Sequence, residues 1–125
     1  MTVTFSQIYP VLRMFSEEKT REFYLDFLGF TVDFEHRFDD NAPLFLQVRR
    51  DSLILRLTEH HGDACPGSAI TVATDNLDEL HKELIGKNYR YMRPGIEKTP
   101  WKTRDLTVMD PSGNRITFSE KATDK

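Results

Sequence analysis

Residues 16–30, SEEKTREFYLDFLGF, carry the pattern of an amphipathic helix, and the rest of the chain can be interpreted from it. Ser16 is a residue type that caps helix N-termini, and the two glutamates after it suit the positive end of the helix dipole. Gly29 suits the left-handed conformation that ends many helices. The residues that recur at helical spacing, and that we expect to be buried, are Thr20, Phe23, Tyr24, Phe27 and Leu28.

Residues 76–86, NLDELHKELIG, repeat this pattern in the second half of the chain. Asn76 stands at the expected cap, and Glu79 follows three residues later, which is the spacing of a capping box. We expect this helix to stop at Gly86, in the same way as the first helix stops at Gly29. Its apolar face consists of Leu77, Leu80, Leu84 and Ile85.

The segments around the two helices correspond as well. Each helix follows a short apolar strand and precedes an extended run and then a hairpin, with turns expected at Asp51 and Asp110. The strands are YPVLRM and AITVAT, and the hairpins are LFLQVRRDSLILRL (44–57) and DLTVMDPSGNRITF (105–118).

The chain is therefore a duplication, with about 57 residues between Gly29 and Gly86. We predict one α+β domain over residues 1–125, made of two βαβββ units at 1–62 and 68–121. Two such units side by side form a curved mixed sheet with the helices on its convex face. The concave face stays open, which is a natural place for a ligand.

Composition limits the functions that are open to this protein. Its 125 residues are 38% hydrophobic and 30% charged, with a net charge of −3, which is typical of a globular protein and unlike a nucleic-acid binder. No apolar run is long enough to span a membrane, and the first residues lack a secretion signal, so we expect a cytoplasmic protein. The single cysteine, Cys65, agrees with a reducing compartment.

Several motifs together resemble a known family. FYLDFLGF (23–30), DNLDEL (75–80) and the pattern PW…DPSGN…F (100–118) are similar to the vicinal oxygen chelate superfamily, which has the glyoxalase and bleomycin-resistance fold. YPVL, LTEHHGDACPGSAITV and TPWKTRDLTVMDPSGNRITF most closely resemble the bleomycin-resistance proteins of that superfamily. The resemblance implies a homodimer with its ligand cleft between the two subunits. Pro10 resembles the hinge after which the first strand is exchanged, although edge pairing without exchange stays open.

The superfamily contains metalloenzymes and metal-free binding proteins. Carried over by resemblance, the four metal-ligand positions fall on residues that are not usual ligands, so we expect no metal and no cofactor. These positions are Tyr9, Arg56, Ala69 and Thr117. The segment TEHHGDAC (58–65) is interpreted as the loop that joins the two units. The alternative is a divalent-metal lyase, dioxygenase or thiol transferase with ligands drawn from Glu59, His60, His61 or Glu120.

The candidate ligand-binding residues are aromatic or charged. Trp101 has an indole that needs either a core or a partner to lie against, and the segment GFTVDFEHRFDDNAPLF (29–45) adds aromatic rings and four carboxylates, Asp33, Glu35, Asp39 and Asp40. We predict a protein that is not an enzyme, binds no nucleic acid or membrane, and confers resistance by sequestering bleomycin-type cationic aromatic antibiotics. An endogenous aromatic cation is a third candidate ligand. The predicted ligand-binding set is Asp33, Phe34, Phe38, Phe45, Arg56, Trp101 and Arg104.

Two features of this set stay open. Strand alternation places Phe34 and Phe38 on one face and Asp33 on the other, unless a bulge or a partner chain intervenes. Arg56 and Arg104 are awkward for a cationic ligand, and they could instead select a carboxylate or a phosphate.

Overall fold

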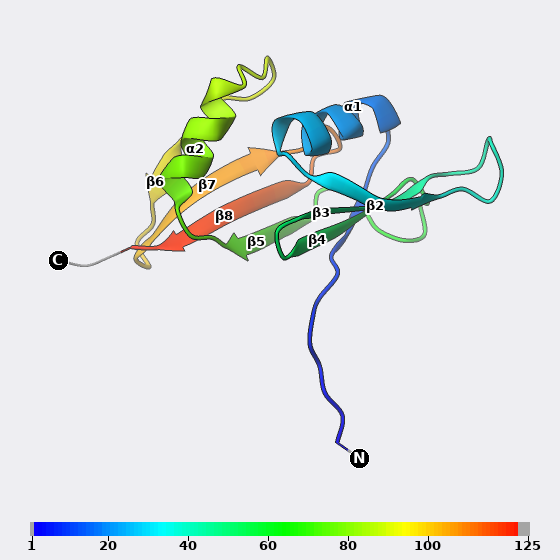
Figure 1. Ribbon diagram of the computed structural model, residues 1–125, viewed down its shortest axis with the longest axis horizontal. Helices are drawn as coiled ribbons and strands as arrows, with labels where there is room; N and C mark the ends of the chain where they lie inside the picture. Colours follow the sequence, from blue (N-terminus) through cyan, green and yellow to red (C-terminus); the bar gives the residue numbers. More distant parts are fainter. Residues whose placement is uncertain (1, 123–125) are drawn as a thin grey trace.

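The computed structural model describes residues 2–122 (Figure 1). In chain order the elements are β1 (Val11–Arg13), α1 (Glu17–Arg21), the π-helical segment η1 (Glu22–Phe27), β2 (Thr31–His36), β3 (Phe45–Arg50), β4 (Leu53–Thr58), β5 (Ala69–Ala73), α2 (Leu77–Gly86), β6 (Ile96–Lys98), β7 (Thr103–Met109) and β8 (Arg115–Lys121). This order is strand, helix and three strands, twice. The predicted α+β fold of two βαβββ units is confirmed.

Each unit forms its own mixed sheet of four strands. The orders are β1-β4-β3-β2 and β5-β8-β7-β6, with the first strand of each unit parallel to its neighbour and the other pairs antiparallel. Among the described residues no strand of one sheet pairs with a strand of the other, so β1 and β5 are both edge strands. Both helices lie on one side of the sheets, and the segment before β1 extends away from the body (Figure 1).

The first helix begins and ends as predicted. The Ser16 hydroxyl accepts a hydrogen bond from the Lys19 amide at 3.1 Å, and Gly29 has a φ of +76°. All five residues expected on the apolar face are buried. The end of the helix is also held from a distance, because the Lys87 ammonium donates to the carbonyls of Asp26 and Phe27 at 2.9 and 2.8 Å.

The second helix has the predicted bounds but different ends. Asn76 is left-handed, with φ +59°, and its side chain caps nothing, so the predicted capping box is wrong. A left-handed residue cannot present its side chain to the first turn as an extended cap does; the amide of Leu77 instead donates to Glu120 at 3.3 Å. Past Gly86 it is Asn88, at φ +50°, that has the left-handed backbone.

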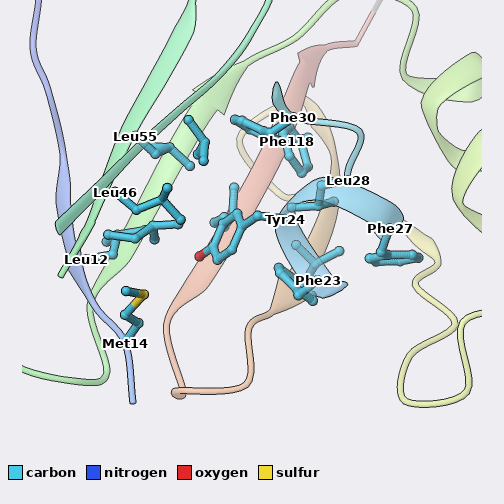
Figure 2. Packing of buried hydrophobic residues seen from close by; sticks show 14 of the residues in the cluster. Leu12, Met14, Phe23, Tyr24, Phe27, Leu28, Phe30, Leu46, Leu55 and Phe118 are labelled. Carbon is cyan, nitrogen blue, oxygen red and sulfur yellow. The ribbon is translucent and has the colours of Figure 1, made fainter. Parts of the chain in front are cut away.

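One core joins the two units. Tyr24 lies among side chains of both sheets and the first helix (Figure 2), and its hydroxyl donates to the Asp110 carboxylate at 2.6 Å. Asn114 donates from its side-chain amide to Asp110 and, at 2.7 Å, to the carbonyl of Arg13 in β1. The turn DPSGN (110–114) of the second unit is therefore bonded to the helix and the first strand of the first unit.

Candidate ligand-binding surfaces

Each sheet turns one face to the core and leaves the other face open. In the first sheet the core face holds Leu46, Val48, Leu55 and Leu57, which are all buried. By alternation the opposite face of β3 and β4 carries the polar residues Gln47, Arg49 and Arg56. We call this surface the open face of the first sheet.

A β-bulge decides which residues of β2 reach this open face. The register between β2 and β3 shifts between Val32 and Phe34, which leaves Asp33 as the extra residue. The Asp33 carboxylate accepts from Gln47 at 3.0 Å and from Arg49 at 3.1 Å, while the Phe34 ring stacks on Phe45 with centroids 6.2 Å apart. Asp33, Phe34 and Phe45 are thus brought together on one face.

The remaining acidic residues of this segment do not join them. Glu35 accepts from Arg21 of α1 at 2.9 Å, and Asp39 accepts from the amide of Asn41 in its own loop. Phe38 lies past the end of β2, is 79% exposed and has edge contacts with His36 and His60. The four carboxylates of residues 29–45 are therefore not gathered on one face.

Arg56 lies on the open face within a chain of polar contacts. Its Nε donates to Gln47 Oε1 at 2.9 Å, Gln47 donates on to Asp33, and the guanidinium lies 4.6 Å from the centroid of the Tyr9 ring. The hydrogen bonds from Gln47 and Arg49 lower the pKa of Asp33. Sequence reasoning missed Gln47, although the alternation of β3 around Leu46 and Val48 already assigns it to the open face.

Trp101 is exposed, at 70% of its full surface, and is not part of the core. It borders a cavity of about 360 Å³ on the open side of the second sheet, together with Glu97, Lys98, Asp105 and Thr107. All lining residues of this cavity come from the second unit, between residues 95 and 107. The first unit therefore supplies none of the residues that line this cavity.

The structure places Arg104 elsewhere. Its guanidinium donates to Asp78 of α2 at 2.7 Å and to Glu120 at 3.1 Å, on the side of the sheet that faces the helix. The hydrogen bond to Arg104 lowers the pKa of Asp78. The prediction that Arg104 lines the cleft is contradicted, because Arg104 has the same strand parity as the core residues Leu106 and Val108.

The alternative metal-ligand set is not brought together either. Within residues 2–122 no group of three or more His, Cys, Asp or Glu side chains is placed to hold a metal ion. Glu59 accepts from the Leu44 amide at 2.7 Å, whereas Glu120 is paired with Arg104 in the other unit.

A larger groove of about 970 Å³ lies on the helix side, between α2 and the turn from β3 to β4. The ion pair of Arg50 with Glu83, at 2.8 Å, lies in its lining. Arg50 also donates to the Leu28 carbonyl of its own unit at 2.7 Å. Its ion pair with Glu83 of α2 therefore connects the two units.

Comparisons with solved structures give proteins of the same fold. TnmS3, an antibiotic-binding protein from Streptomyces sp. CB03234, is 19% identical over 97% of this chain and 100% of its own, with a TM-score of 0.71. A bleomycin-binding protein from Streptomyces verticillus, complexed with copper(II)-bleomycin, is 28% identical over 98% of this chain and 100% of its own, with a TM-score of 0.65. A glyoxalase-related enzyme from Clostridium phytofermentans is 18% identical over 95% and 97%, with a TM-score of 0.72.

The similar structures thus include both antibiotic-binding proteins and an enzyme. No curated protein matches the sequence. The helices of residues 2–122 are too short and too polar for any of them to span a bilayer. The family model for glyoxalase superfamily proteins matches residues 1–125, and the chain belongs to this superfamily.

Proposed function

We propose that this protein binds an aromatic antibiotic of the bleomycin type stoichiometrically and without chemical conversion, in the cytoplasm. The observation that carries the proposal is the exposed Trp101 beside a cavity lined by one unit alone. An indole left 70% exposed gives up burial worth roughly 2 kcal/mol, and a ligand that stacks on it recovers this free energy. The antibiotic-binding proteins of the same fold support this function.

The proposed site needs two copies of the chain. Trp101 supplies an aromatic wall from the second sheet, and the stacked pair Phe34 and Phe45 supplies another from the first sheet. β1 and β5 are edge strands of their sheets, which suits pairing between copies. Residues 2–9 support exchange of the N-terminal segment at Pro10, because Val3, Phe5 and Ile8 are 78%, 95% and 82% exposed.

A fluorescence titration tests the proposal. Trp101 is the only tryptophan, so bleomycin that stacks on it changes the protein emission at 340 nm or so. We expect saturation at one bleomycin per chain, with a dissociation constant of about 1 µM or below. A flat titration up to roughly 50 µM contradicts sequestration.

The variant Trp101→Ala provides the matched measurement by calorimetry. Because the indole is exposed, we expect its loss to change the free energy of unfolding by less than about 0.5 kcal/mol while weakening bleomycin binding at least about tenfold. The control is Tyr91→Ala, which removes another exposed ring from the loop after α2 and should leave binding unchanged. Equal affinity of Trp101→Ala and the wild type would remove the indole from the site.

A further inference from the structure

The open face of the first sheet holds two arginines that no carboxylate of residues 2–122 neutralises, Arg13 of β1 and Arg56 of β4. Arg49, on the same face, is paired with Asp33 at 3.1 Å. Asp33 is therefore already compensated, and the positive charges of Arg13 and Arg56 are left over on this face.

Both guanidiniums are stacked on aromatic rings. Arg13 lies 4.5 Å from the centroid of Phe15, and Arg56 lies 4.6 Å from that of Tyr9. When a guanidinium stacks on a ring, its N–H groups point outward in the plane of the guanidinium. There they can donate two hydrogen bonds to one oxyanion in a forked geometry. Arg56 donates to Gln47 through its Nε alone. The buried Nε of Arg13 has no acceptor among the described residues.

The two arginines are neighbours on adjacent strands. In the parallel pair of β1 and β4, Val11 lies opposite Arg56 and Arg13 opposite Thr58. Strand spacing and rise place the Cα atoms of Arg13 and Arg56 about 8 Å apart, within reach of a single ligand group for two long side chains. Because β1 is an edge strand of its sheet, this pair lies where the cleft between two copies is proposed to form.

We infer that Arg13 and Arg56 form an oxyanion subsite of this cleft, which takes the carboxylate of an aromatic ligand while the rings of that ligand lie against the aromatic walls. The inference rests on the cleft of the proposed function, but it assigns to this cleft an anionic aromatic ligand beside the cationic antibiotic, and each ligand is tested by its own titration. A ligand with a cationic group at this place would face two uncompensated charges of its own sign. Asp33, which was predicted to bind the ligand, is paired with Arg49, and the nearby Glu35 is paired with Arg21.

Two probes with the same ring system and opposite charge test this inference. Anthracene-9-carboxylate and 9-(aminomethyl)anthracene are titrated into the full-length wild-type protein and followed by fluorescence anisotropy. We expect the carboxylate to bind at least about tenfold more tightly than the amine. Equal affinities, or a preference for the amine, overturn the inference, and bleomycin binding measured separately still decides the proposed function.

Variants assign the preference to the two arginines. Arg13→Gln combined with Arg56→Gln should weaken binding of the carboxylate about tenfold and leave the amine unchanged within about twofold. Arg93→Gln is the control, because Arg93 is exposed and donates to the Asn88 side chain at 3.3 Å, away from the open face of the first sheet. An unchanged preference in the double variant overturns the inference. If the double variant loses the dimer in sedimentation but still prefers the carboxylate to the amine, the inference is overturned as well, because the arginines would then serve the contact between copies.

Discussion

At the scale of single residues, Asp110 holds the two units together. Its carboxylate accepts from the Tyr24 hydroxyl and the Asn114 side chain, and also from the amides of Ser112 and Asn114 at 2.9 Å each. Asp110→Ala leaves these donors without an acceptor, several of them in the core. Each unsatisfied buried group costs about 1–3 kcal/mol.

We therefore expect Asp110→Ala to lower the free energy of unfolding by about 2–4 kcal/mol in urea titrations. Asp40→Ala removes an exposed loop carboxylate and should change this free energy by less than about 0.5 kcal/mol. If both variants unfold at the same urea concentration as the wild type, the bonds of Asp110 do not contribute to stability.

We expect the buried Tyr24 to make the protein less stable at alkaline pH. Burial, reinforced by the charge of Asp110, raises the pKa of Tyr24 well above its usual 10. Above pH 10 or so the unfolded chain releases this proton while the folded chain keeps it, so the free energy of unfolding falls by about 1.4 kcal/mol per pH unit for this group. Its contribution is fully present below about pH 10.

The comparison with Tyr24→Phe isolates this effect. The variant should be about 1 kcal/mol less stable at pH 7, because it lacks the bond to Asp110. Between pH 10 and 12 its free energy of unfolding should fall less steeply than that of the wild type. Parallel curves over this range would show that Tyr24 does not titrate differently in the two states.

At the scale of elements, two glycines that look equivalent in sequence have different roles. Gly29 has a φ of +76°, and a Cβ there would lie 3.3 Å from Arg50 Nη1. Gly86 has a helical backbone with open space around it. We expect Gly29→Ala to destabilise the protein by about 1–2 kcal/mol and Gly86→Ala to stabilise it by about 0.5–1 kcal/mol. Thermal unfolding measures whether each variant is less or more stable than the wild type. Changes of stability with the same sign in both variants would contradict the assigned backbone conformations.

The helices and the hairpins could be predicted from sequence because their signals are local. The apolar spacing from Thr20 to Leu28 and the turns at Asp51 and Asp110 each depend on residues within one element. The capping of the second helix could not be predicted from sequence, because the partner of the Leu77 amide is Glu120, which is distant in sequence. The bulge at Asp33 likewise depends on pairing with β3.

The candidate site depends more on pairing between distant segments. The sequence left open whether Trp101 lies in a core or against a partner, and the structure has it exposed. Arg104 could have been rejected from sequence, since alternation with Leu106 and Val108 turns it toward the helix. Arg13 escaped notice, and Tyr9 was considered only as a metal-ligand position, because the parallel pairing of β1 with β4 brings together residues that are distant in sequence.

At the scale of the whole molecule, we expect the N-terminal segment to contribute to the association of two copies. Residues 2–8 extend from the body (Figure 1). The Phe5 side chain in this segment is 95% exposed. Removing them should weaken association of two copies at least about tenfold in sedimentation equilibrium, because each buried aromatic ring stabilises an interface by about 2 kcal/mol. Phe5→Ser should give a smaller loss of the same sign. An unchanged dissociation constant would exclude exchange of this segment.

Native mass spectrometry of the wild-type protein with excess bleomycin tests the central claim most directly, because it reports assembly, stoichiometry and the ligand mass together. The account predicts a dimer that carries two bleomycins, each released at its original mass. A protein that stays free of ligand, or that releases bleomycin with an altered mass, contradicts the account.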